Sequence, residues 1–546
     1  MKKLLITFAL TIGINLFLPD PASAGLSGGV TVTTATGGNN ISADKAANAS
    51  SPGFTTLGDI VMAERSASDL SAGNNVTLIL TAPSGWSFKA GVGSVSAQTL
   101  RDISAASISV SASTITITYT VSGTANLDTM TISGIQVQSA DGAALPSSGT
   151  ILRTSANPGT AGILGITLDT TSFGSLSQTV GTAIKLAFST EPGSAVAGAI
   201  FGVQPVVETQ DQFGNNSAIG LPSSRIVTLS LSAGTGPLQG TLTSNIGTSA
   251  GNGTVSFTDL RIDIAGTNKQ LTAAASTFTS AISAFTVGPA TANRITIQTQ
   301  PPATATAGLP FAAHPVIRIE DIYGNLRIND NGIVITVARN AGLGTLQGIL
   351  TAPTTNGVAT FTNLSHKVAN TINLIFTCTD LPSIISSNIV VSPGTANQLV
   401  FSTQPGGAVV NSNLVTQLVV KTQDSFGNDS TVNLAATKNV LMTLTSGPGS
   451  LLGTTTLNIG TSGGNGIVVY TNLRITAANS ADQLTASASS FGSITSILFA
   501  VTKANQTITF GNLANKCYGD APFTLDATAS SGLPVSYSIV SGPATI

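Results

Sequence analysis

The feature that most constrains the fold is an internal repeat, because four short motifs recur in the same order in three successive units. Each unit begins with alternating apolar and polar residues that stop at Pro192, Pro301 or Pro405. An Asp-x-aromatic-Gly-Asn motif, a Gly-x-Leu-x-Gly motif (Gly449-Ser-Leu-Leu-Gly in the third unit) and an Asn-Gly pair follow in each unit. Self-similarity of this kind is the signature of a tandem array, so each unit is expected to fold as one domain.

The Asp-x-aromatic-Gly-Asn motif predicts a structural turn. Its key residues are Asp211, Gly214 and Asn215, then Asp321, Gly324 and Asn325, and finally Asp424, Gly427 and Asn428. In such a turn Asp can accept hydrogen bonds from its own backbone, Gly and Asn tolerate positive φ, and the aromatic ring can pack onto the core.

Calcium binding is the alternative role for the repeated aspartates. Calcium needs six to eight oxygen ligands, usually with several carboxylates among them. Residues 329–331 (Asn-Asp-Asn) form a local oxygen cluster, but no dense Asp-x-Asp pattern is present and the whole chain has only 23 acidic residues. The pattern therefore favours turn capping over metal binding.

The strand pattern predicts an all-β protein of tandem immunoglobulin-like β-sandwiches after a larger N-terminal β-sandwich domain. Alternating β-branched residues at 76–81 and 113–121 indicate strands, and 130–137 reads as a strand with a bulge at Gly134. Several short strands per hundred residues with frequent turn signals are typical of two-sheet sandwiches. Residues 163–180 read as a connector.

The repeats set the expected domain boundaries. The predicted segments are a signal peptide at 1–24, an N-terminal sandwich at 25–180, repeats at 181–289, 290–393 and 394–503, and a truncated β-module at 504–546. The last segment contains two predicted strands, at 506–510 and 534–539, and is too short for a stable sandwich of its own.

The first 24 residues predict export. Lys2 and Lys3 precede a largely apolar stretch at 4–18, and an Ala-Ser-Ala cleavage site ends at Ala24. No later stretch is long and apolar enough to span a membrane, so no transmembrane segment is expected after cleavage. The expected location is extracellular or at the cell surface.

Composition argues against nucleic-acid binding and against catalysis. Charged residues make up 8% of the chain, against about 25% in ordinary soluble proteins. With 21 basic and 23 acidic residues the chain has no excess of positive charge for phosphates. His314 and His366 lack convincing partners and are interpreted as surface or turn residues, and Cys378 and Cys517 as incidental thiols. No enzyme activity, metal or cofactor is predicted.

Taken as a set, the repeat motifs across 181–503 resemble those of bacterial immunoglobulin-like domains of the invasin and intimin type. Residues 516–525 and 530–537 resemble the front half of the "mostly β" repeat modules found in large secreted Bacteroidetes surface proteins. These resemblances imply an exported, often adhesive, multidomain protein.

The functional hypothesis is a non-enzymatic structural or adhesive protein whose repeats form a stalk and present a binding module. The partner would be a host or environmental surface glycan or protein. One alternative is carbohydrate binding by the N-terminal domain around Trp86, although Trp86 fits a core aromatic better. Another is that the chain is the non-catalytic part of a larger secreted enzyme.

Overall fold

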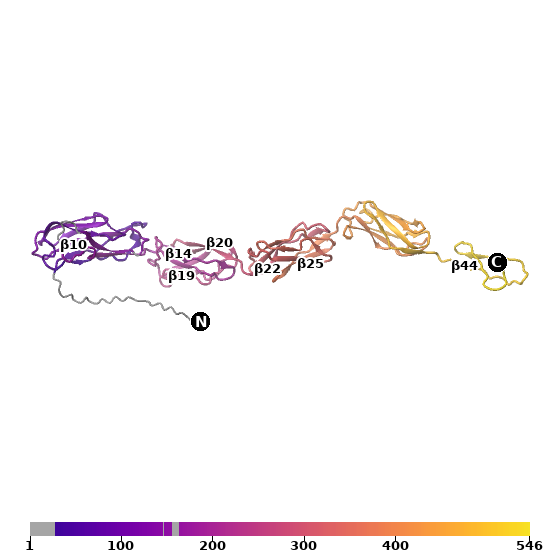
Figure 1. The fold of residues 1–546 in the computed structure, drawn as a ribbon, viewed down its shortest axis with the longest axis horizontal. Coiled ribbons are helices and arrows are strands. Elements are labelled where there is room, and N and C mark those ends of the chain that lie inside the picture. Colours follow the sequence, from indigo (N-terminus) through magenta and orange to yellow (C-terminus); the bar gives the residue numbers. More distant parts are fainter. Residues whose placement is uncertain (1–27, 146, 156–162) are drawn as a thin grey trace, which may run out of the picture. The chain divides into compact units, whose positions relative to one another are not determined.

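The computed structural model describes residues 28–145, 147–155 and 163–546, so the predicted signal peptide lies outside the described residues. The fold is all-β, and the described part of the chain contains only one short helical element, the 3-10 helix η1 (Ala43–Lys45). The chain divides into two compact units, Met1–Pro289 and Ala290–Ile546. Each sandwich is built from one continuous stretch of sequence, as the colour gradient of Figure 1 shows.

The N-terminal domain of the first unit packs one large sheet against two smaller ones. The six-stranded sheet has the order β2-β13-β12-β5-β9-β8, made by Ile41–Ser42, Ser172–Thr179, Ser148–Ser155, Gly73–Thr81, Thr114–Val121 and Ile103–Val110. The smaller sheets are β1-β4-β10-β7 (Thr31–Thr33, Ile60–Ala63, Thr129–Ser133, Ser94–Ala97) and β3-β11-β6 (Thr55–Thr56, Gln136–Ser139, Trp86–Phe88). The alternating residues of β9 bury Ile115, Ile117 and Tyr119 in the common core.

Two sequence expectations for this domain were wrong. The segment 163–180 is not a connector, because β13 pairs with both β12 and β2 and contributes Phe173 and Leu176 to the core. Gly134 is not a bulge within one strand. It has φ +70 and separates β10 from β11, so the chain passes from one sheet into another at this residue.

Repeat 1 has an immunoglobulin-like arrangement of two sheets. The three-stranded sheet is β14-β16-β19 (Lys185–Thr190, Val206–Gln210, Thr254–Ser256). The five-stranded sheet is β15-β21-β20-β17-β18 (Ala195–Val196, Ala281–Gly288, Gly266–Ala274, Ile226–Ala233, Thr243–Asn245). Pro192 lies between β14, at the edge of the three-stranded sheet, and β15, at the edge of the five-stranded sheet. Because proline has no backbone N–H to donate to a neighbouring strand, it suits the point where the chain passes from one sheet to the other.

Repeats 2 and 3, in the second unit, reproduce this topology. Repeat 2 has the sheets β22-β24-β28 (Ala292–Thr299, Val316–Asp321, Val358–Thr360) and β23-β32-β30-β25-β27 (Thr304–Thr306, Ile389–Ser392, Thr371–Cys378, Val334–Ala341, Thr351–Pro353), with β31 (Leu381–Ile385) beside β30 and the pair β26-β29 (Leu346–Gln347, Ser365–His366). Repeat 3 has β33-β35-β39 (Gln398–Thr403, Leu418–Gln423, Ile467–Tyr470) and β34-β43-β41-β36-β38 (Ala408–Val409, Phe499–Thr502, Asn479–Ala488, Asn439–Ser446, Thr456–Asn458), with β42 (Gly492–Thr495) beside β41 and the pair β37-β40 (Leu451–Leu452, Arg474–Ile475).

The Asn-Gly pairs form the tight turns that the sequence predicts. Asn465 and Gly466 have φ +47 and +86 and lead directly into β39. The Gly466 carbonyl accepts the amide of Thr422. Because asparagine and glycine tolerate positive φ, this pair lets the chain reverse next to the strand that it pairs with.

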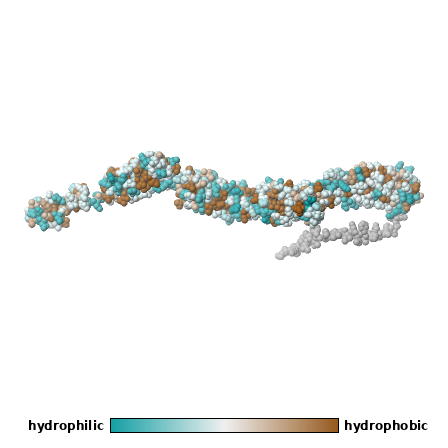
Figure 2. Space-filling model, turned by 180° about the vertical axis from the view of Figure 1, so that it is seen from behind, coloured by the Kyte–Doolittle hydropathy of each residue, from teal (hydrophilic) through white to brown (hydrophobic). Residues whose placement is uncertain are grey.

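The C-terminal segment forms a two-stranded ladder, β44 (Ile508–Phe510) with β45 (Ala527–Ala529). The first predicted strand is therefore present, but the second lies at Ala527–Ala529 and not at 534–539. Tyr537 packs against Phe510 with ring centroids 5.8 Å apart, and its hydroxyl donates to the Leu525 carbonyl and accepts from the Ala527 amide. On the face that Figure 2 draws, hydrophobic and hydrophilic residues are interspersed along the chain.

Candidate functional site

The Asp-x-aromatic-Gly-Asn turn is the site that recurs in all three repeats. In repeat 3 it follows β35, and the Asp424 side chain is buried beneath it. Asp424 Oδ1 accepts hydrogen bonds from the backbone amides of Phe426 (2.9 Å) and Asn428 (3.0 Å). Oδ2 accepts one bond from Asn428 Nδ2 and one from the Gly394 amide, both at 2.8 Å. Gly394 lies in the segment that enters the repeat, so the carboxylate joins turn and linker.

Repeats 1 and 2 have the same geometry. Asp211 and Asp321 each accept the amides of the aromatic residue and the asparagine on Oδ1, and on Oδ2 the asparagine side chain and a linker amide, which belongs to Gly181 or Ala290. Four N–H donors therefore surround each carboxylate. Since these donors present positive hydrogens to every side of the carboxylate, the geometry is that of a turn cap and not of a cation ligand. Across the described residues, no group of three His, Cys, Asp or Glu side chains could hold a metal ion.

These hydrogen bonds also set the charge state of the turn. Burial alone would raise the pKa of the Asp424 carboxyl, but hydrogen bonds from Asn428, Gly394 and Phe426 outweigh it and hold the pKa below its ordinary value. Asp321 shows the same balance, and its pKa is also lowered. Both carboxylates are therefore firmly ionised at neutral pH.

A second contact fixes the linker through its carbonyl. In repeats 1 and 3 the donor is a buried serine hydroxyl, Ser217 to the Gly181 carbonyl and Ser430 to the Gly394 carbonyl, each at 2.5 Å. In repeat 2 the corresponding residue is Arg327, whose Nη1 donates to the Ala290 carbonyl at 2.6 Å. The carbonyl oxygen of the linker is thus bound by a serine hydroxyl in repeats 1 and 3 and by an arginine guanidinium in repeat 2.

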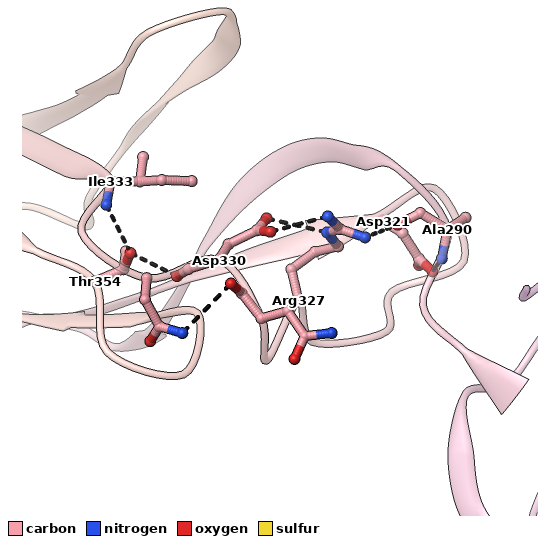
Figure 3. Close-up of polar contacts among 8 residues, drawn as sticks. Ala290, Asp321, Arg327, Asp330, Ile333 and Thr354 are labelled. Atoms are coloured by element: carbon pink, nitrogen blue, oxygen red, sulfur yellow. Dashed lines mark hydrogen bonds and ion pairs between the residues drawn. The ribbon is translucent and has the colours of Figure 1, made fainter. Parts of the chain in front are cut away.

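Arg327 is itself held by the cluster shown in Figure 3. Its guanidinium binds both carboxylate oxygens of Asp330, at 3.0 and 2.9 Å. The Asp330 carbonyl accepts the Thr354 hydroxyl, which in turn accepts the Ile333 amide. Asp330 belongs to the 329–331 oxygen cluster considered for calcium, and its carboxylate instead pairs with a guanidinium.

The aromatic residue of the motif does not join the core of its own repeat, contrary to the sequence expectation. Tyr323 and Phe426 remain 41% and 42% exposed, and Phe213 is half-buried. The core beneath the turn is filled instead by strand residues such as Leu418 and Val420. The ring positions are therefore free to serve contacts outside the sandwich.

Trp86 lies in the core of the N-terminal domain. It begins β6, is 6% exposed and belongs to the buried cluster that includes Phe88 and Val137. Its indole Nε1 has no hydrogen-bond partner. In this position the ring presents no face on which a sugar could stack.

The histidines and cysteines are dispersed. His314 is exposed before Pro315, as a surface residue. The surface interpretation was wrong for His366, which is fully buried in β29 and contacts the Leu343 carbonyl through Nε2 at 2.7 Å. Its burial follows from β29 pairing with β26 under the Gly344 loop. Cys378 and Cys517 are both free.

A buried acidic pair in the N-terminal domain was not foreseen. Glu64 accepts the Leu70 amide on Oε1 and the Asp128 amide on Oε2, at 2.5 and 2.9 Å. Asp128 in turn accepts the amides of Asp102 and Ile103. Burial, with repulsion from neighbouring carboxylates, raises the pKa of both Glu64 and Asp128. These side chains connect the end of β4 to the loops before β8 and β10.

No protein-family model matches the sequence, and no curated protein matches it. Among solved structures, the chain is similar to the Escherichia coli adhesin FdeC, with 15% identity over 59% of this chain and 96% of that chain and a TM-score of 0.27. InvD of Yersinia pseudotuberculosis has 13% identity over 59% of this chain and 98% of that chain, with a TM-score of 0.28. A β-glycosidase from Bacteroides vulgatus has 14% identity over 38% of this chain and 25% of that chain, with a TM-score of 0.19. These identities and TM-scores are too low to assign the chain to a family.

Proposed function

We propose that the protein is an exported, non-enzymatic structural or adhesive protein whose immunoglobulin-like repeats form a stalk that presents a binding module at the cell surface. The observation that carries the proposal is the linker-binding turn that recurs in all three repeats. In each repeat a buried aspartate accepts the backbone amide of the entering segment, and a serine or arginine donates to the carbonyl of that segment. Such hydrogen bonds hold each domain in a fixed direction relative to the segment that enters it, which is what a stalk requires.

The N-terminal domain supports the second half of the proposal, because it differs from the repeats in size and in topology. It has a six-stranded sheet with two smaller sheets, whereas each repeat pairs a three-stranded with a five-stranded path. In the repeats, the polar side chains of the recurring turn are used for backbone contacts. Partner recognition is therefore assigned to the N-terminal domain, and no residue of it is singled out.

The test uses the full chain coupled to beads. Adhesion is measured to glycan arrays and to host-cell or mineral surfaces, with Fab fragments raised against the N-terminal domain or against repeat 3. Adhesion that only the N-terminal Fab blocks supports the proposal. Adhesion blocked equally by the repeat 3 Fab, or an absence of adhesion to all surfaces, would refute the assignment of a presented binding module. X-ray scattering of the same chain must also show an extended particle, since a compact one contradicts the stalk.

A further inference from the structure

The turns at Asp211 and Asp424 also contact the domain that precedes them in the chain. The contact at Asp211 lies within the first compact unit and the contact at Asp424 within the second. In repeat 3, Asn428 Nδ2 donates to the Lys367 carbonyl at 2.8 Å, and Asn428 Oδ1 accepts the Ala369 amide at 2.7 Å. Lys367 and Ala369 belong to repeat 2. The Asn428 side chain therefore binds its own turn and the preceding repeat at once.

The exposed aromatic ring completes this contact. The Phe426 ring lies directly on Gly308 of repeat 2, so closely that a Cβ at Gly308 would overlap the ring. The Lys367 ammonium sits over the same ring, 5.6 Å from its centroid. Gly308 has φ +80, so the residue that receives the ring is one where glycine is also favoured by the backbone. The ring thus contacts a surface outside its own sandwich.

Repeat 1 meets the N-terminal domain in the same way. Asn215 Nδ2 donates to the Gly142 carbonyl at 2.9 Å, and the Phe213 ring lies against Gly142 where a Cβ would overlap it. Gln212 adds a bond to Asp44 and accepts the Ser50 amide. An asparagine amide on a backbone carbonyl and an aromatic ring on a glycine therefore recur at two joints, one between two repeats of the same topology and one between a repeat and the N-terminal domain.

We propose that the Asp-x-aromatic-Gly-Asn turns at Asp211 and Asp424 are interdomain clasps, each of which orients its domain on the preceding one through the asparagine amide and the aromatic ring and does so without a metal ion. Domains joined by small contacts normally move relative to one another. Here the clasp is anchored by the aspartate, whose four N–H donors hold the turn and the linker in one position. The inference rests on the proposed stalk only for its biological use, since the joint can be measured by itself.

The test measures the joint between repeats 2 and 3 in the full chain. Spin labels are placed at the exposed strand positions Thr336→Cys and Thr443→Cys after Cys378→Ser and Cys517→Ser, and the distance distribution is recorded by pulsed electron resonance. The parent chain should give one narrow distribution. The double variant of Phe426→Ala and Asn428→Ala should broaden it by about twofold or more, because the domains then move freely.

Three controls make the result specific. Ser425→Ala changes an exposed residue of the same turn and should leave the width unchanged. Lys367→Ala, on the receiving repeat, should broaden it without touching the turn itself. Hydrogen exchange of β36 and β41 must stay at the parental rate in every variant, which shows that repeat 3 remains folded.

An unchanged width in the double variant, or a parental distribution already as broad as that of the variant, would overturn the clasp. A distribution that narrows with added calcium chloride, or widens with a chelator, would overturn its metal independence. A failure of adhesion with a narrow parental distribution would instead count against the proposed function and leave the clasp intact.

Discussion

Replacing Asp482 by isoleucine should stabilise repeat 3. Asp482 lies in β41 opposite Phe499 of β43 and is fully buried. The equivalent position in repeat 2 is Ile372, which lies opposite Ile389 and is 1% exposed. One repeat therefore places a carboxylate where another places an aliphatic side chain.

The expected gain follows from how poorly this carboxylate is paired. Oδ1 accepts one bond, from Asn479 Nδ2 at 3.0 Å, whereas Oδ2 is buried with no partner. A buried polar group without a partner costs about 1–3 kcal/mol, and an apolar replacement removes that cost. Isoleucine is larger than aspartate, but Ile372 of repeat 2 sits beside Gly342 just as Asp482 sits beside Gly447, so the site has a shape that accepts it. The net gain should be about 1–3 kcal/mol.

Hydrogen exchange is the suitable assay, because unfolding of a multidomain chain is not a single two-state transition. Exchange of amides in β36 and β41 should slow by about tenfold for each 1.4 kcal/mol gained, while β17 and β20 of repeat 1 serve as an unchanged reference. The near-isosteric Asp482→Asn variant removes the charge without filling the site and should gain less. Equal or faster exchange in the isoleucine variant would refute the argument that the unpaired oxygen destabilises this repeat.

Three further predictions concern other sites. Trp86→Phe should lower the free energy of unfolding of the N-terminal domain by less than about 1.5 kcal/mol, since Nε1 makes no hydrogen bond. Trp86→Ala should lower it by about 3–5 kcal/mol because it leaves a cavity. Thermal unfolding of the N-terminal domain, followed by hydrogen exchange, measures both changes. Arg327→Ala should destabilise repeat 2 by about 1.5–3 kcal/mol, and Arg327→Ser should recover part of that loss by donating to the Ala290 carbonyl, as serine does in the other repeats; equal losses would contradict this. The folded pKa of Asp424 lies below its unfolded value near 3.8, so the stability that its carboxylate contributes is present above that pH and is lost as the pH falls through the folded pKa. Hydrogen-exchange protection in the turn of repeat 3 should therefore drop in this pH range. An Asp424→Asn variant, which has no carboxyl group to titrate, should not show this drop.

The sequence predicts the shape of the turn well because the hydrogen bonds inside the turn join residues two to four positions apart. Aspartate, glycine and asparagine within five residues have one common low-energy arrangement, and the structure shows that arrangement in each repeat. The partner surface was not predictable from the motif, because Gly142 and Gly308 lie far from their rings in sequence. A ring that stays exposed at a turn is the signal that could have suggested an external contact.

The segment 163–180 was missed for a different reason. Its strand β13 has small polar residues between Phe173 and Leu176, so its apolar content resembles that of a linker. Only pairing with β12 on one side and β2 on the other makes it a sheet strand, and pairing is a property of the fold. His366 was missed likewise, since its two-residue strand gives no periodic signal.

The buried polar groups of the repeats differ sharply in how well they are paired. The turn carboxylates have four donors each, whereas the core position of Asp482 has one, and the same position in repeat 1 holds the buried Lys269, whose ammonium donates to the Thr235 carbonyl and whose pKa is lowered by burial. The period-two burial patterns of β20 and β41 place Lys269 on the same face as Leu271 and Asp482 on the same face as Leu484, so both polar side chains lie on an apolar face. Repeat 2, with Ile372 there, has no such cost. Considering this core position by itself, repeats 1 and 3 are expected to unfold at a lower denaturant concentration than repeat 2.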